Sequence, residues 1–151
     1  MLGVYLVQTV PPGKLARMWF IIENYYPMFL EGLKYTLLIS ILGTIFGVAI
    51  GMVLVSMKLL KISERDSFFT KVFKKTSIVF STAYVDVIRG TPMMIQAIIL
   101  YYWFLYPTFQ MGFLGAGIFI VTINTAAYAT EVLRGTIQAI DVGQMEAARS
   151  L

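Results

Sequence analysis

The chain contains neither cysteine nor histidine. Their absence excludes disulfide bonds, thiol nucleophiles, histidine bases and the commonest ligands of transition metals. The sequence also carries no glycine-rich nucleotide-binding loop, and its apolar segments hold no paired carboxylates. We therefore predict that the chain is not an enzyme and holds no metal or cofactor, so that any energy it uses comes from a partner.

Charged residues are scarce as well. They make up 13% of the 151 residues, whereas 58% are hydrophobic. Ordinary globular domains carry about 25% charged residues, and a soluble fold of this size cannot bury so much apolar surface. The composition therefore predicts an all-α membrane protein that lies in the lipid bilayer.

Six of the twelve basic residues gather in one stretch, residues 58–75. A basic stretch of this kind is often a solvated loop or a nucleic-acid patch. Beside a hydrophobic span, the excess of Lys and Arg instead predicts a cytoplasmic loop, and we expect no nucleic-acid partner. The basic residues of this stretch are Lys58, Lys61, Arg65, Lys71, Lys74 and Lys75.

The first predicted membrane helix covers residues 33–57, which hold no charge from Tyr35 to Met57. Gly43, Gly47 and Gly51 are four residues apart, so they share one side of this helix, and a partner helix can approach closely there. Residues 1–29 are predicted to form a segment at the outer membrane surface.

The next segment, "TSIVFSTAYVDVIRGTPMM", begins as an amphipathic helix. An apolar stripe at helical spacing, which includes Val79, Phe80 and Val87, predicts the face that packs on the membrane or on other helices. Asp86 and Arg89 are three residues apart on another face, and we expect them to form an ion pair.

The sequence "RGTP" predicts a break after this amphipathic helix. Gly90 is suited to the end of a helix, Thr91 to the N-cap of the next one, and Pro92 to the first helical position. The second membrane helix is therefore predicted at residues 92–110. Its apolar part is short for a full span, so either the preceding stretch completes the crossing or the helix continues past Pro107 with a kink.

The third membrane helix is predicted at residues 113–134. Glu131 and Arg134 can pair near its end, and Gly135 is a suitable C-cap. If residues 58–75 are cytoplasmic, the N-terminus lies outside and residues 136–151 are cytoplasmic too. Gln96 and Asn124 are the polar side chains predicted at membrane depth, where they can line a solute path or make hydrogen bonds between helices.

The segment "GQMEAARSL" places Ala147, Ala148 and Leu151 on one side of a helix. Small side chains let a short helix fit a groove of another protein, and Glu146 can pair with Arg149 on the exposed side. An Ala-rich patch alone is weak evidence, because alanine and glutamate favour any helix.

The segments "VDVIRGTPMMIQ" and "AAYATEVLRGTIQAIDVGQMEAARSL" resemble the polar amino acid group of binding-protein-dependent ABC transporter permeases. "FLEGLKYTLLIS" resembles the first helix of the same group. Residues 25–151 carry the resemblance. The positions that match its turn and the end of its third helix are Asp86, Arg89, Gly90, Thr91, Pro92, Gln96, Ala127, Tyr128, Glu131, Arg134 and Gly135.

The resemblance implies a subunit of about five membrane helices in the bacterial cell membrane that works as a homodimer or heterodimer. It implies that an extracytoplasmic binding protein delivers an amino acid and that separate ATPase subunits bind ATP. The segment 136–151 would then be a partial coupling helix that docks on the ATPase. The residues expected to make this contact are Gly143, Glu146, Ala147, Ala148, Arg149 and Leu151.

Measured against this group, residues 30–151 hold three of the five helices, and the chain ends inside the "EAA" signature. We therefore expect a C-terminally truncated permease domain. The alternatives are a membrane structural or assembly subunit that moves no solute, and an intramembrane enzyme, which the missing catalytic residues disfavour.

Overall fold

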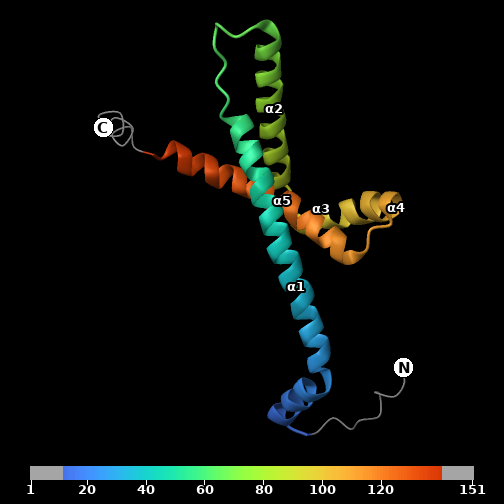
Figure 1. The fold of residues 1–151 in the computed structure, drawn as a ribbon. Helices are drawn as coiled ribbons and strands as arrows, with labels where there is room; N and C mark the ends of the chain where they lie inside the picture. Colours follow the sequence, from blue (N-terminus) through green and yellow to red (C-terminus); the bar gives the residue numbers. More distant parts are fainter. Residues whose placement is uncertain (1–11, 141–151) are drawn as a thin grey trace. The chain divides into compact units, whose positions relative to one another are not determined.

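The computed structural model describes residues 12–140, and every regular element in this range is helical. The chain divides into two units between Leu37 and Leu38, a boundary that falls inside the first helix. In chain order (Figure 1), the elements are α1 (Lys14–Lys58), α2 (Phe68–Gly90), α3 (Met93–Ile99), the π-helix η2 (Leu100–Leu105), α4 (Tyr106–Phe109) and α5 (Phe113–Gln138).

Within the first unit, α1 presents large apolar side chains such as Trp19, Met28 and Phe29 at its surface. Polar side chains here bond within the helix, since Asn24 Nδ2 donates to the carbonyl of Phe20 at 2.8 Å. The helix begins at Lys14, well before the predicted start at residue 33. The predicted position of residues 1–29 at the outer membrane surface stays a prediction.

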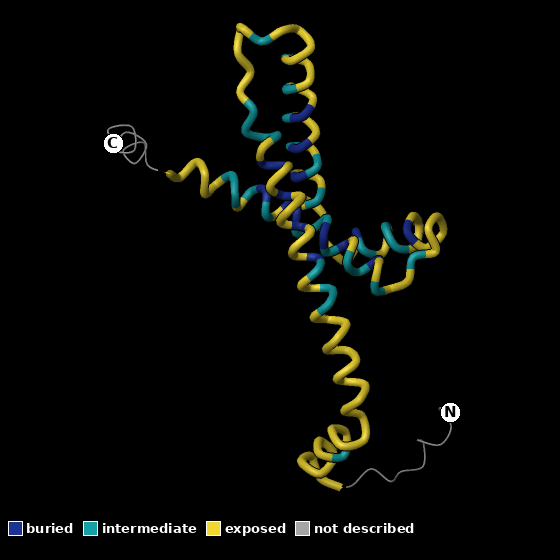
Figure 2. Tube along the Cα trace, in the orientation of Figure 1, coloured by how far each residue is buried: buried dark blue, intermediate teal, exposed yellow. Residues whose placement is uncertain are grey.

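In the second unit, α1 and α5 approach each other closely at three glycines. A Cβ atom on Gly47 would lie 2.6 Å from Thr125 Cβ, so the two helices meet where a side chain is missing. The glycines at positions 43 and 51 are covered in the same way by Val121 and Ala129 of α5. Figure 2 shows the buried residues gathering where α1, α2 and α5 meet. The glycine spacing thus marks the side of α1 that lies against α5.

Helix α2 packs on α5 through small and polar residues. Ser77, Ser81 and Val85 are its buried residues, four apart, and Tyr84 Oη donates to the carbonyl of Ile123 in α5 at 2.7 Å. The bulky residues of the apolar stripe, Val79, Phe80 and Val87, are all exposed, so they are not the face that packs on α5, and their predicted place against the membrane stays a prediction. Lipid solvates large apolar side chains as well as a protein core does, so close helix contacts in membranes favour small residues instead.

A sharp break separates α2 from the elements that follow. The axis of α2 is bent by 104° relative to the stretch Met93–Phe109. Thr91 is the C-cap of α2 and Pro92 the N-cap of α3, so the new helix starts at Met93, and the prediction of Thr91 as its N-cap was wrong by one residue. Past Ile99 the backbone becomes a π-helix and continues into α4, which contains Pro107 and ends at Phe109. Its C-cap residue, Gln110, lies in the left-handed region.

The candidate membrane spans are helices, as the sequence predicts. Helices α1 and α5 are long and apolar enough to cross a bilayer, and α2 with the stretch Met93–Phe109 makes a third candidate if the bent pair is one span. The loop predicted at residues 58–75 is shorter, because α2 already begins at Phe68. Gly135 is not a C-cap, since α5 continues to Gln138 and is capped by Ala139. The prediction of an all-α membrane fold is confirmed.

Candidate functional site

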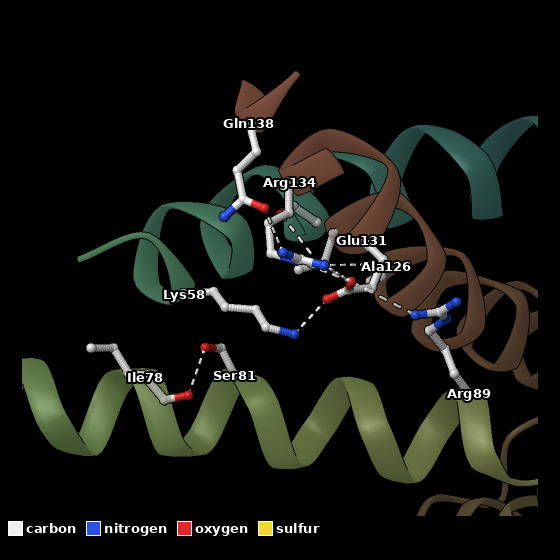
Figure 3. A network of polar contacts seen from close by, with 10 residues as sticks. Lys58, Ile78, Ser81, Arg89, Ala126, Glu131, Arg134 and Gln138 are labelled. Carbon is white, nitrogen blue, oxygen red and sulfur yellow. Dashed lines mark hydrogen bonds and ion pairs between the residues drawn. The ribbon is translucent and has the colours of Figure 1, made fainter. Parts of the chain in front are cut away.

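One carboxylate, that of Glu131 in α5, collects cations from three helices (Figure 3). Lys58 Nζ, at the last residue of α1, donates to Glu131 Oε1. Arg134 donates to Oε2 through Nη2 at 2.8 Å and Nε at 3.0 Å, and through Nη1 to Gln138 Oε1 at 2.6 Å. Arg89, in the last turn of α2, lies 3.9 Å from the same carboxylate. We call Lys58, Arg89, Glu131 and Arg134 the Glu131 network.

The burial and composition of the Glu131 network set its strength. The side chains of Lys58 and Glu131 are 15% and 16% exposed, so salt and water weaken the attraction of this pair less than that of a surface ion pair. Three cations surround a single carboxylate, which leaves excess positive charge. Lys58 and Arg89 also lie in the last turns of α1 and α2, where a cation is favourable beside the partial negative charge of the helix end. The network therefore ties the C-terminal ends of α1 and α2 to α5.

The predicted pairing of Glu131 with Arg134 is present, but that of Asp86 with Arg89 is not. Arg89 instead extends toward Glu131, and its guanidinium lies 5.4 Å from the ring centroid of Tyr128. Asp86 is exposed. A partner on another helix competes with the pairing along one helix, which is worth only about 0.2–0.5 kcal/mol.

Gln96 and Asn124 are brought together at the break. Gln96 is the buried residue of α3, and its Nε2 donates to the carbonyls of Ile88 and Thr91 at 2.6 and 2.9 Å. The Thr91 hydroxyl also accepts from Gln96 Nε2 at 2.6 Å, and it donates to the carbonyl of Val87 at 2.9 Å. Asn124 Nδ2 of α5 donates to Gln96 Oε1 at 3.4 Å.

The loop between α1 and α2 is also held by a polar contact. Asp66 Oδ2 accepts from Lys74 Nζ at 2.7 Å and from the backbone N–H of Ser63 at 2.9 Å. The hydrogen bond from Lys74 and then that from Ser63 hold the pKa of Asp66 below its usual value of 3.8. Basic residues thus serve as internal contacts here as well as giving the loop its charge.

Sequence reasoning missed the partners of two residues. Lys58 was counted only as part of the basic stretch, and Tyr84 was assigned no hydrogen-bond partner. A lysine at the last position of a helix is a signal for a local role, but nothing in the sequence connects it with a residue 73 positions away. Residues 12–140 contain no group of acidic side chains that could hold a metal ion.

The predicted coupling residues lie outside the part of the chain that the structure describes. From segment 136–151, only residues up to Ile140 are included, and α5 ends at Gln138. The docking role therefore stays a prediction for Gly143, Glu146, Ala147, Ala148, Arg149 and Leu151.

Residues 67–151 match the family described as the binding-protein-dependent transport system inner membrane component. This match covers more than half of the chain and includes α2, the break, α3, α4 and α5. The chain belongs to this family. Its helical fold and its candidate membrane spans agree with an inner membrane component.

The relatives of this family member are amino acid permeases. The chain is 38% identical to the arginine transport system permease protein ArtQ of Bacillus subtilis, covering 83% of the chain and 52% of ArtQ. It is 33% identical to the putative glutamine transport system permease protein GlnP of Rickettsia conorii, covering 85% and 55%. The crystal structure of an amino acid ABC transporter with histidines matches with a TM-score of 0.69 and 34% identity, covering 87% and 56%. The chain spans about half the length of the curated relatives it matches.

Proposed function

We propose that this chain is part of a permease subunit of an ABC importer that moves a polar amino acid across the bacterial cell membrane. The observation that carries the proposal is the family match over residues 67–151, together with relatives that are named as arginine and glutamine permeases. An extracytoplasmic binding protein would deliver the solute, and a second permease subunit would complete the path. ATP would bind and be hydrolysed in separate ATPase subunits.

The helix contacts suit such a role. Alternating access requires helices that move as rigid bodies, and the glycines of α1 let it lie directly against α5 with few side chains between the two backbones. The Glu131 network fastens the ends of α1 and α2 to α5. Displacement of α5 would therefore carry the ends of both other helices with it.

The chain would receive the force of ATP binding through segment 136–151, which begins in the last turn of α5. Small residues at Ala147 and Ala148 would seat a short helix in a groove of the ATPase, with Glu146 and Arg149 on its rim. This segment begins two positions after Arg134, which belongs to the Glu131 network. A pull on the segment would thus reach α5 first and then the ends of α1 and α2.

Transport is tested with the full-length protein, reconstituted in proteoliposomes with its ATPase and its binding protein. We expect ATP-dependent uptake of a labelled polar amino acid, and no uptake when the ATPase carries an inactive nucleotide site. The assay should include arginine, glutamine and histidine, with leucine as an apolar control. A complex that assembles fully but takes up none of the polar amino acids would instead support a structural or assembly subunit.

Coupling is tested by Ala148→Trp, which makes one small residue of the proposed docking face bulky. We expect that the ATPase no longer co-purifies with the Ala148→Trp variant. The matched control is Ile62→Trp in the loop between α1 and α2, where the native side chain is 48% exposed and already large. ATPase binding that survives Ala148→Trp unchanged would contradict the coupling role of this segment.

A further inference from the structure

The break between α2 and α3 leaves backbone carbonyls that need hydrogen-bond donors, and the Gln96 side chain bonds two of them. The last carbonyls of a helix have no partner within it, and inside a membrane no water is at hand to bond them. Near the end of α2, the carbonyl of Ile88 and that of the cap residue Thr91 both accept from Gln96 Nε2. Gln96 belongs to α3 and is only 9% exposed, so the next helix supplies part of the hydrogen bonding that closes the end of α2.

The other end of the Gln96 amide reaches α5. Gln96 Oε1 accepts from Asn124 Nδ2 at 3.4 Å, so one side chain joins the end of α2, the start of α3 and the middle of α5. An amide nitrogen has two hydrogens, and three acceptors already lie within 2.9 Å of Gln96 Nε2. A solute that bonded this nitrogen would have to displace a backbone carbonyl or the Thr91 hydroxyl.

We propose that Gln96 is a positioning residue that fixes the break between α2 and α3 against α5, and that it does not contact the transported solute. This inference rests on the proposed function for its transport readout. Its structural readout, the geometry of the break, stands without it. The three acceptors compete for the two hydrogens of the nitrogen, and Asn124 donates to the oxygen.

The geometry is tested by distance measurement between spin labels. Residues 1–151 contain no cysteine, so introduced cysteine pairs can be labelled selectively once any cysteine elsewhere in the full-length protein is replaced. Suitable positions are Val79 of α2 and Phe109 of α4, which are 58% and 59% exposed and lie on opposite sides of the break. We expect Gln96→Leu to shift or broaden the distance distribution in the full-length protein.

Two variants serve as matched controls. Thr91→Ser keeps the hydroxyl that bonds Gln96, so its distribution should stay as in the native protein. Asn124→Leu removes only the contact at 3.4 Å and leaves the bonds across the break, so its change should be smaller than that of Gln96→Leu. If Gln96→Leu does not fold, Thr91→Val decides, because it removes one of the three acceptors and should shift the distribution in the same direction. An unchanged distance distribution in Gln96→Leu, or in Thr91→Val if Gln96→Leu does not fold, would overturn the proposal.

The transport readout separates positioning from solute contact. In proteoliposomes, Gln96→Leu should lower the maximal uptake rate about tenfold, because two carbonyls at the break lose their donor, while the apparent KM changes less than about twofold. A KM raised about tenfold at an unchanged maximal rate would instead make Gln96 a solute ligand. If the native protein takes up no amino acid, the proposed function fails, and the spin-label distances still decide the role of Gln96.

Discussion

Replacing Gly47 with alanine tests the contact between α1 and α5 directly. The new Cβ atom would lie 2.6 Å from Thr125 Cβ and 3.0 Å from the carbonyl oxygen of Thr122. Carbon atoms in ordinary contact are about 3.5–4.0 Å apart, so the helices must separate by about 1 Å. A change of rotamer gives no relief, because the backbone of α5 fixes both of these atoms.

The net effect combines two opposed contributions. Overpacking of this kind costs about 1–3 kcal/mol, whereas alanine favours a helix over glycine by about 1 kcal/mol. Gly32→Ala is the matched control, because it lies in the same helix and its new Cβ would meet nothing within 4 Å. The control therefore has the higher helix propensity of alanine without the overpacking. Gly47→Ala should be less stable than Gly32→Ala by about 1–3 kcal/mol.

The two variants are compared by thermal unfolding of the full-length protein in detergent, followed by circular dichroism of the helical signal. Each kcal/mol corresponds to roughly 2–4 °C in Tm for a chain of this size, so the Tm of Gly47→Ala should lie at least a few degrees below that of Gly32→Ala. If Gly47→Ala melts at the same temperature as the control or above it, the close approach of α1 and α5 at this glycine is refuted.

Three further predictions use the same unfolding assay. Glu131→Gln leaves the cations of the Glu131 network without their carboxylate and should lower the stability by about 1–3 kcal/mol, between an exposed and a buried ion pair; no loss would mean that the network is only a surface feature. Tyr84→Phe removes the hydroxyl that donates to the Ile123 carbonyl and should cost about 0.5–1.5 kcal/mol; a more stable variant would contradict this bond. Because the pKa of Asp66 is lowered in the folded state, its contact with Lys74 stabilises the protein above pH 3.8 and is lost below it. The difference between the native protein and Asp66→Asn should therefore vanish in acid, and a constant difference at all pH values would exclude this origin.

The membrane fold and the α1 contact face could be predicted because each depends on residues close in sequence. A long uncharged run specifies a span by its length alone, and glycines four apart share one side of any helix. The packing face of α2 could not be read in this way. Its apolar periodicity is clear, yet in lipid the bulky residues face outward, and the buried positions are Ser77, Ser81 and Val85.

The site was predictable only where partners lie on one helix. Glu131 with Arg134 follows from a spacing of three, and the structure has this pair. The same rule gave Asp86 with Arg89, which the structure lacks, because α5 brings Glu131 within 3.9 Å of Arg89. Contacts between residues far apart in sequence depend on how helices cross, and no spacing in the sequence encodes the crossing.

The two polar clusters share one helix, and this has a consequence for movement. Glu131 of α5 holds the ends of α1 and α2, and Asn124, seven positions earlier on α5, contacts the amide that closes the break after α2. Helix α2 is thus fastened to α5 both through Arg89 and through Gln96, on either side of its final residue. A helix fastened at two such points cannot turn freely against α5, so any rearrangement must either break one cluster or move α2 and α5 together. Because Arg89 is 42% exposed and lies 3.9 Å from the Glu131 carboxylate, high salt should loosen this ion pair first, while the uncharged Gln96 contacts stay in place.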